Sequence, residues 1–489
     1  MKIKLIAPAR KPEWGESFWD LKTLCKFTGR KAGGAPLALP TLAALTPSDV
    51  EVVLTDENVE TIDFDEKVDL IGITGMTCVI PRSYEIADEY RRRGIPVIMG
   101  GIHVSMLPEE AIQHCDAVVV GEAEEIWAQV VRDAQKKNLQ KFYRAPRFPD
   151  LSNSPIPRWD LLKNDKYCYF TIQTGRGCPY DCEFCSVKVF NGREYRHKTI
   201  EQVVKEVEIL LKLDFRKLIF FSDDNLLAVP SYAEELCNEL SRLTIKNWMC
   251  QASLNRLRDE NLLQRMRQGG CRVVFVGIES VSQSSLHAMN KHQVNNVNEY
   301  KDIIHKVHNQ GISIFGSFIF GSDNDTERIF EDTITFINEN RIAFAMVNIM
   351  TLLPGTKLYE RLKSEKRAED FPWWKTNADW VCFQPKRMSR MVLEEGHERV
   401  LKEIYGYRNQ YNRLQALWDK NIFTRDKKYR YSMTRIFFTL YAFLCLNFSK
   451  ARFLIKSLWY AKKTTSILWI LTALNYNSYV RSFKRERNV

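Results

Sequence analysis

Residues 175–185 read GRGCPYDCEFC, and the three cysteines, Cys178, Cys182 and Cys185, have the spacing CxxxCxxC. Three thiolates in one short loop can ligate one face of a cubane iron–sulfur cluster. Because a four-iron cluster normally takes four protein ligands, three cysteines leave one iron open to bind and activate a substrate. This stretch therefore predicts the metal centre of a catalyst.

A structural zinc site is the main alternative for this loop. Zinc takes four ligands, usually as two closely spaced pairs. The nearest further candidates are Cys168, ten residues before the loop, and His197, twelve residues after it, and neither makes a second close pair. Three unrelated core cysteines are the other alternative. The spacing favours the iron–sulfur cluster over both.

The loop resembles the cluster motif of the radical S-adenosylmethionine (SAM) enzymes, including the aromatic residue Phe184 just before the third cysteine. The resemblance implies a [4Fe–4S] cluster whose free iron is chelated by the amino and carboxylate groups of SAM. Reductive cleavage of SAM would then give a 5′-deoxyadenosyl radical. It also implies an external electron donor such as a flavodoxin or a ferredoxin.

The composition indicates a globular protein of two or three domains. The chain has 489 residues, of which 45% are hydrophobic and 27% are charged. Apart from the one cluster, its twelve cysteines are scattered, as is usual in a reducing cytoplasm. The apolar start of the chain is too short for a secretory signal, and no apolar run reaches the eighteen residues of a spanning helix. We therefore expect a cytoplasmic protein.

The positive charge is concentrated at the end of the chain. Residues 420–489 contain 15 Lys and Arg but only two acids, whereas the rest of the chain carries a net charge of −2. Nucleic-acid binding by the whole protein is therefore not expected, and no such motif supports it. Apolar stretches at 436–446 and 467–474, flanked by basic residues, favour helices in a membrane interface. An extra helical layer with a solvated basic face is the alternative.

Residues 1–140 alternate strand and helix patterns. Continuous apolar strands separated by helices predict a parallel, doubly wound Rossmann-like sheet, which binds ligands at the carboxyl ends of its strands. The strands are expected at 4–7, 50–55, 70–74, 96–99 and 117–120, and the helices at 37–45, 81–93, 108–114 and 122–136.

The strand ends of this region resemble the cobalamin-binding domain fused to many radical SAM proteins. The phrases VIMGGIH at 97–103 and VGEAE at 120–124 carry the resemblance, and no GxGxxG supports a nicotinamide site. The DxHxxG motif is absent, and the corresponding region reads DENVE at 56–60. Any cobalamin would thus lack a histidine ligand from that motif, and His103 is expected to shape the loop. The implied cobalamin contacts are Thr74, Gly75, Gly100, Gly101, His103, Gly121 and Glu122.

A proline-rich linker is expected at 141–165, followed by a second alternating region at 166–352. Six βα units with right-handed crossovers predict a partial TIM barrel, (β/α)6, with chemistry at the carboxyl ends of its strands. The cysteine loop follows the first strand. The strands are expected near 169–174, 217–222, 248–252, 272–278, 313–320 and 345–352, and the helices near 200–213, 231–243, 259–268, 297–309 and 325–339.

Polar groups at the other strand ends are candidates for holding SAM. Asp223 and Asp224 end the second strand, Glu279 ends the fourth, and the fifth runs to Gly321. Carboxylates can bind an ammonium group or a ribose, and Phe184 offers a flat wall for adenine. Helix capping or solvated turns are the alternative for the acids. The segments also resemble the SAM-contacting strand ends of the family.

The chain after 352 is expected to be mainly helical, with a substrate-side extension at 353–419 and the basic apolar tail at 420–489. Trp373, Trp374, Trp380 and Phe383 fit a substrate cavity and core packing equally well. The tail suggests a lipid-like substrate or peripheral membrane contact, and hopanoid-methylating proteins offer a precedent.

Together these features favour a cobalamin-dependent radical SAM methyltransferase. The resemblance implies that one SAM methylates cobalamin, while a second SAM is cleaved to a radical that abstracts hydrogen from an unactivated carbon. The substrate radical would then take the methyl group. No side chain stands out as a catalytic acid or base. A cyclase or rearrangement enzyme without methyl transfer is one alternative. A membrane-surface protein with an inactive site is another, against which the intact cysteines count.

Overall fold

The computed structural model describes residues 1–18, 20–243, 245 and 247–419, together with eight single positions between 453 and 480. The expected interfacial helices at 436–446 and 467–474 lie outside these residues, except for positions 473 and 474. In the described part of the chain, no helix is both long enough and apolar enough to cross a bilayer.

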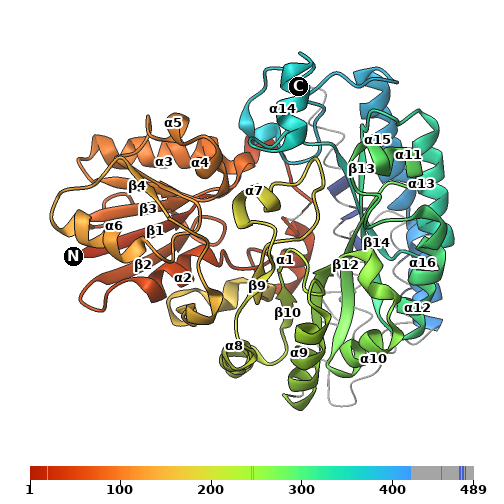
Figure 1. The fold of residues 1–489 in the computed structure, drawn as a ribbon, viewed down its shortest axis with the longest axis horizontal. Helices are drawn as coiled ribbons and strands as arrows, with labels where there is room; N and C mark the ends of the chain where they lie inside the picture. Colours follow the sequence, from red (N-terminus) through yellow and green to blue (C-terminus); the bar gives the residue numbers. More distant parts are fainter. Residues whose placement is uncertain are drawn as a thin grey trace.

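The first body of the protein is a six-stranded parallel sheet in the order β2-β1-β3-β4-β5-β6. Helices cover both of its faces (Figure 1), so the prediction of a doubly wound sheet is confirmed. On one face lie α2 (Ala38–Leu45) and α6 (Trp127–Gln135); on the other lie α3 (Ile80–Arg92), α4 (Ile102–Met106) and α5 (Pro108–Ala111). The strands are β1 (Lys2–Ala7), β2 (Glu51–Asp56), β3 (Leu70–Thr74), β4 (Val97–Gly100), β5 (Ala117–Val120) and β6 (Phe142–Arg144).

The sequence pattern did not predict the edge strand β6, which lies in the stretch expected to be a linker. It pairs in parallel with β5 over Val118↔Phe142, Val119↔Tyr143 and Val120↔Arg144. Three residues are too few to show an alternating pattern, and prolines follow at once, so propensity alone could not identify this strand. The helix α1 (Lys22–Thr28) was not predicted either, because seven residues make too few turns to show a clear helical period.

The second body is an open parallel sheet in the order β14-β13-β12-β11-β10-β7, curled into a partial barrel as predicted. The helices that follow the first five strands pack on the outside of this sheet (Figure 1). The strands are β7 (Tyr169–Ile172), β10 (Leu218–Phe221), β11 (Trp248–Ala252), β12 (Cys271–Glu279), β13 (Ser313–Phe320) and β14 (Phe344–Ile349); the helices are α8 (Ile200–Asp214), α9 (Pro230–Arg242), α10 (Glu260–Gln268), α11 (Gln283–Ala288), α12 (Tyr300–Asn309) and α13 (Arg328–Glu339).

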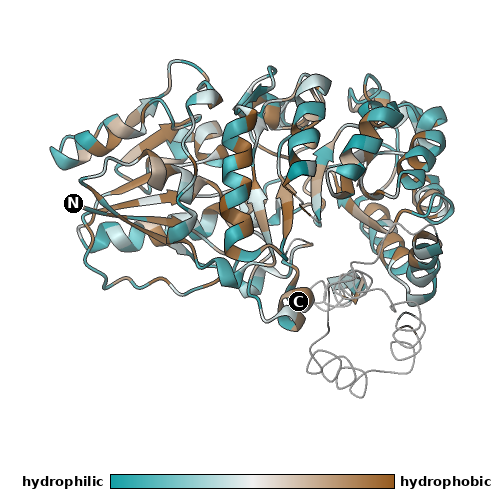
Figure 2. Cartoon of the chain, turned by 90° about the horizontal axis from the view of Figure 1, so that it is seen from below, coloured by the Kyte–Doolittle hydropathy of each residue, from teal (hydrophilic) through white to brown (hydrophobic). Residues whose placement is uncertain are grey.

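Local sequence explains why these elements begin and end where they do. The helix α8 starts with a capping box, in which Thr199 accepts a hydrogen bond from the Gln202 amide and Gln202 accepts one from the Thr199 amide. All eight residues of β13 are buried, which is the pattern of a central parallel strand covered on both faces. Figure 2 shows the same partition, with hydrophobic residues in the strands and hydrophilic residues on the outer sides of the helices.

A small antiparallel hairpin, β8 (Gly175–Arg176) and β9 (Arg196–His197), frames the cysteine loop and the short helix α7 (Val187–Asn191). This hairpin lies between the two bodies (Figure 1). The following region contains α14 (Lys357–Ser364), α15 (Arg390–Ile404) and α16 (Tyr407–Asp419), and α15 packs on α13 and β14. Between α14 and α15, the 3-10 helix η8 (Trp373–Lys375) returns to the first body and contacts α3.

Candidate active site

A cleft of about 1300 Å³, counting its open mouth, lies where the carboxyl ends of the first sheet face the hairpin of the second body. Its floor is apolar and is formed by strands β1, β3, β4 and β5 and helices α2 and α6. Leu5, Leu39, Ile98, Val119 and Trp127 are among its lining residues. On the barrel side the cleft is lined by Gln173, Arg176, Phe190 and Lys198. The cleft therefore ends next to the cysteine loop.

Five of the seven predicted cobalamin contacts line this cleft: Thr74, Gly100, Gly101, Gly121 and Glu122. The backbone of Gly121 has φ +86°, and an added Cβ would meet nothing within 4 Å. Gly101 has φ +101°, and its Cβ would come within 2.9 Å of the Thr74 hydroxyl. Only glycine adopts these conformations readily. The open space at Gly121 lets a large flat ligand approach the backbone, whereas at Gly101 a side chain would press on Thr74. The residues present thus fit a corrinoid.

The other two predicted contacts do not line the cleft. Gly75 packs against Ser83 of α3, whose hydroxyl lies 2.5 Å from the place of a Cβ. His103 is completely buried, and its Nε2 lies 3.2 Å from the Glu110 carboxylate. Burial favours the neutral form of Glu110, but hydrogen bonds from His103, Tyr84 and Trp373 outweigh it and lower the pKa of this carboxyl. His103 therefore takes part in the contact between the first sheet and η8.

The three cysteines lie half-buried in the loop between β8 and α7. The loop is held by its backbone: the Cys185 amide donates to the Cys182 carbonyl (3.2 Å), and the Glu183 amide donates to the Met289 carbonyl (3.1 Å). Burial raises the pKa of Cys185 to about 12, so a bound cation is needed to hold it as a thiolate. The donor set and its burial fit an iron–sulfur cluster.

The two additional ligands considered for zinc lie elsewhere. Cys168 Sγ is 3.5 Å from Cys25 Sγ, and the His197 ring packs on Tyr232 with ring centres 4.0 Å apart. Within the described ranges, no group of three or more His, Cys, Asp or Glu side chains is gathered closely enough to hold one metal ion. In a cubane each thiolate binds a different iron, so the three sulfurs need not converge on a single point.

Asp223 is buried and faces the start of the cysteine loop. It accepts hydrogen bonds from the Thr174 amide (3.1 Å) and hydroxyl (2.7 Å), from the Tyr195 hydroxyl (2.9 Å) and from the Gly175 amide. Both carboxylate oxygens of Asp223 are thus hydrogen-bonded within the protein. Asp224 accepts from the Gly177 amide (3.0 Å), and burial raises its pKa to about 6. Both acids fix the backbone that leads into Cys178.

Glu279 ends β12 at a bulge in an unusual left-handed conformation, with φ +64°. Such a conformation costs a non-glycine residue about 1–3 kcal/mol and is often found at functional sites. Its carboxylate lies 3.2 Å from the ammonium of Lys291, a residue that the sequence pattern did not single out. Burial disfavours the Lys291 charge, but the negative charges of Glu279 and of the Cys182 and Cys185 thiolates outweigh burial and raise the Lys291 pKa. A buried cation therefore stands beside the cysteines.

The remaining predicted SAM contacts, Phe184 and Gly321, both pack against other residues of the protein. Phe184 is half-buried and packs on the main core. Gly321 has φ +102°, and a Cβ there would clash with Phe383 at 2.7 Å. Its amide donates to Asp325 (2.9 Å) in the turn after β13. Phe383 is completely buried, whereas Trp373, Trp374 and Trp380 are half-buried.

Arginines flanking the cysteine motif join the two bodies, and the sequence pattern did not single them out either. Arg176, two residues before Cys178, lies 2.7 Å from Glu122 and 2.6 Å from Glu124. Arg196 of the neighbouring strand also pairs with Glu122, whose side chain is only 2% exposed. No local pattern relates these arginines to acids more than fifty positions earlier. Glu122, predicted to shape the cleft, is thus also a contact to the cluster loop.

A parallel sheet with an open ligand cleft, joined to a partial barrel whose first loop carries CxxxCxxC, defines a radical enzyme with two cofactor sites. Residues 172–337 match the Radical SAM superfamily, and residues 31–131 match the B12 binding domain. Together with the relatives below, these matches show that the chain belongs to the cobalamin-dependent radical SAM enzymes. Its cofactors are a [4Fe–4S] cluster, SAM and cobalamin.

Relatives in this family carry out more than one reaction. The bacteriochlorophyllide d C-12(1)-methyltransferase of Chlorobaculum tepidum is 30% identical over 379 residues, covering 76% of this chain and 82% of that protein. The hopanoid C-2 methylase of Rhodopseudomonas palustris is 28% identical, covering 71% and 67%. The anaerobic magnesium-protoporphyrin IX monomethyl ester cyclase of Rubrivivax gelatinosus is 26% identical, covering 74% and 69%.

Solved structures share the fold. The radical SAM methyltransferase TsrM from Kitasatospora setae, with cobalamin and a [4Fe–4S] cluster bound, superposes with a TM-score of 0.65 at 15% identity, covering 100% of this chain and 99% of that one. The cobalamin-dependent radical enzyme OxsB with aqua-cobalamin bound gives a TM-score of 0.64 at 14% identity, covering 100% and 80%. At this identity the similarity concerns the architecture alone.

Proposed function

We propose that this protein transfers a methyl group to an unactivated carbon of an apolar, lipid-like or similarly hydrophobic substrate. The observation that carries the proposal is a continuous cleft, which runs from the glycine-rich strand ends of the first sheet to Arg176, beside the cysteine loop. A methyl donor bound in this cleft lies next to the place where a radical would form. The methyltransferase relatives support the same reaction.

The cofactors supply the chemistry: SAM bound at the cluster is the source of the radical, and cobalamin is the source of the methyl group. The chain holds and orients them. Cys178, Cys182 and Cys185 ligate three irons, and Asp223 fixes the loop that carries them. Glu279 and Asp224 are proposed to bind polar groups of SAM, with Phe184 and Gly321 shaping its site.

On the first body, Thr74, Gly100, Gly101, Gly121 and Glu122 are proposed to shape the cobalamin cleft. The apolar floor keeps water away from the reactive groups, because strands and helices leave few polar atoms there. The electron for SAM cleavage is proposed to come from a flavodoxin or ferredoxin. Residues 420–489, with their net charge of +13, are proposed to contact a membrane surface peripherally.

A cyclisation or rearrangement without methyl transfer is the second candidate, because the Rubrivivax gelatinosus cyclase covers a similar share of the chain. The two candidates differ in their products. Methyl transfer gives S-adenosylhomocysteine together with 5′-deoxyadenosine, whereas the other reactions give 5′-deoxyadenosine alone. Hopanoids and bacteriochlorophyllides are the first substrates to test, as hydrophobic molecules of the kinds that the relatives' names give.

The test is anaerobic purification from cobalamin-fed cells, followed by iron–sulfur reconstitution and product analysis with dithionite as reductant. We expect about four irons and one corrinoid per chain and both SAM products. Cys182→Ala should lose the cluster and all SAM cleavage while keeping its corrinoid, because the proposed cobalamin contacts all lie on the first body. A reconstituted wild type without corrinoid would contradict the methyltransferase proposal.

A further inference from the structure

The helix α14 lies directly against the cysteine loop. It begins at Lys357, after a turn at Gly355, and is capped by Thr356, whose hydroxyl accepts a hydrogen bond from the Tyr359 amide (3.2 Å). The first turn of the helix also binds the loop, because the Leu358 amide donates to the Glu183 carbonyl (3.0 Å). A backbone contact of this kind fixes the register of the helix relative to the loop.

Both acids within the cysteine motif are paired with bases of this helix. Lys357 Nζ lies 2.6 Å from an oxygen of Asp181, which also pairs with Lys188. Arg361 binds Glu183, the residue between Cys182 and Phe184, through Nε and Nη2. Two parallel N–H···O contacts between a guanidinium and a carboxylate fix orientation as well as distance.

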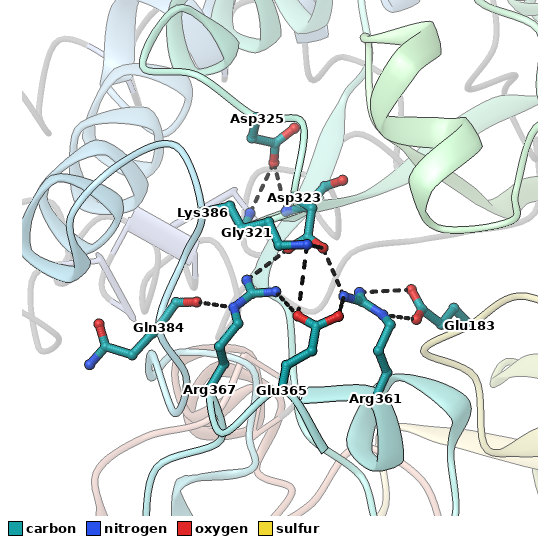
Figure 3. Close-up of polar contacts among 10 residues, drawn as sticks. Glu183, Gly321, Asp323, Asp325, Arg361, Glu365, Arg367, Gln384 and Lys386 are labelled. Carbon is teal, nitrogen blue, oxygen red and sulfur yellow. Dashed lines mark hydrogen bonds and ion pairs between the residues drawn. The ribbon is translucent and has the colours of Figure 1, made fainter. Parts of the chain in front are cut away.

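The same guanidinium also reaches the turn after β13. Arg361 Nη1 lies 2.7 Å from Asp323, which follows Gly321 and Ser322. Figure 3 shows Arg361 between Glu183 on one side and Asp323 with Glu365 on the other. Arg367 (2.7 Å) and Lys386 (3.0 Å) complete the pairing of Asp323. The network thus contains three acids and three bases, and Arg361 is the member that touches two separate segments of the barrel.

We propose that Arg361 is a positioning residue, which holds the cluster loop and the strand-end turn at Gly321 in the geometry that binds SAM. The proposal rests on the assignment of the three cysteines to the cluster, which Cys182→Ala tests separately. Two groups that must bind one ligand together lose affinity when either shifts by a fraction of an ångström. Because the Arg361 side chain binds both the cluster loop and the turn after β13, its removal should shift both groups.

The test compares Arg361→Gln with Arg361→Lys and with Arg328→Gln, a control whose side chain is 85% exposed on α13. Each reconstituted protein is reduced, and SAM is titrated while the electron paramagnetic resonance spectrum of the cluster is recorded. We expect Arg361→Gln to keep its iron but to need about tenfold more SAM for the half-maximal spectral change, a loss of about 1.4 kcal/mol. Arg361→Lys should lie between it and the wild type, and Arg328→Gln should match the wild type.

An unchanged SAM titration of the iron-loaded fraction in Arg361→Gln would overturn the proposal, even if its thermal stability falls. That result would assign Arg361 a purely stabilising role. If Arg361→Gln does not load iron, Glu183→Gln removes the charge of the other partner and retains an acceptor. It must then show the same weakened SAM titration, and a wild-type titration there would also overturn the proposal. None of these readouts depends on methyl transfer.

Discussion

At the scale of single residues, the site contains buried acids whose carboxylate oxygens already accept hydrogen bonds from the protein. Asp223 and Asp325 each accept several hydrogen bonds from nearby backbone and hydroxyl groups. Their role in the structure is to fix turns that end strands β10 and β13. A carboxylate that accepts two or three donors in a buried turn defines the backbone more strictly than a neutral side chain can.

The burial of Asp325 also predicts a pH dependence of stability. Burial raises the pKa of this carboxyl to about 6, even though Ser285 and the amides of Gly321 and Ser322 favour its charged form. Between about pH 4 and pH 6 the folded protein therefore keeps a proton that the unfolded chain has released. The free energy of unfolding should fall as pH rises through this window, by up to about 3 kcal/mol.

Asp325→Asn does not titrate and serves as the reference. The difference in unfolding free energy between wild type and Asp325→Asn, measured by urea denaturation of the cluster-free protein, should move in favour of the variant between pH 4 and pH 6. Taking the difference removes the contribution of the other carboxyls. A difference that stays constant over this range would show that Asp325 is ionised throughout in the folded protein.

At the scale of elements, the strand ends of the first sheet make the cleft. The sequence identified five of the six strands, because continuous apolar runs between helices are typical of parallel strands buried on both faces. It also placed the glycines at the carboxyl ends, where parallel strands must meet a ligand. It counted His103 among the cobalamin contacts, but this residue does not line the cleft. A histidine two residues beyond the glycine pair can turn toward the ligand or into the adjoining helix layer, and the local sequence does not decide between the two.

Gly121→Ala tests the cleft with a well-matched control. An alanine with φ +86° costs about 1–2 kcal/mol, and its Cβ meets no protein atom within 4 Å. Gly94→Ala introduces the same strain at φ +74°, also in open space, but away from the cleft. Both variants should lose similar stability, and only Gly121→Ala should bind hydroxocobalamin more weakly, by about tenfold in an absorbance titration. Equal affinity in the two variants would place cobalamin elsewhere.

At the scale of the whole molecule, the contacts that assemble the site are long-range ion pairs. Glu183 and Arg361 are 178 positions apart, and Glu122 and Arg196 are 74 apart. Apolar periodicity predicts elements, and strand-end chemistry predicts which residues face a ligand. Neither specifies which base meets which acid once the bodies pack, so Arg176, Lys291 and Arg361 could be found only from the fold. The cysteine loop is held from both sides by such pairs.

The pair between the two bodies can be removed with little change of shape. Glu122→Gln keeps the size of the buried side chain but leaves the partly buried guanidinium groups of Arg176 and Arg196 with one acid fewer. Breaking one side of a buried ion pair costs about 3–5 kcal/mol, because the remaining charge is not solvated. We expect Glu122→Gln to lower the unfolding free energy by about 3 kcal/mol, since the amide oxygen still accepts one hydrogen bond.

Glu125→Gln is the control for this experiment. Glu125 lies three residues further along and pairs with Arg147 at 3.7 Å, but both side chains reach solvent, with exposed fractions of 33% and 75%. An exposed pair of this kind contributes at most about 1 kcal/mol. Urea denaturation of the two variants should therefore separate them by about 2 kcal/mol or more. Because Glu122 also lines the cleft, Glu122→Gln alone should weaken hydroxocobalamin binding. Equal unfolding free energies of the two variants would mean that the bodies are held together without this pair.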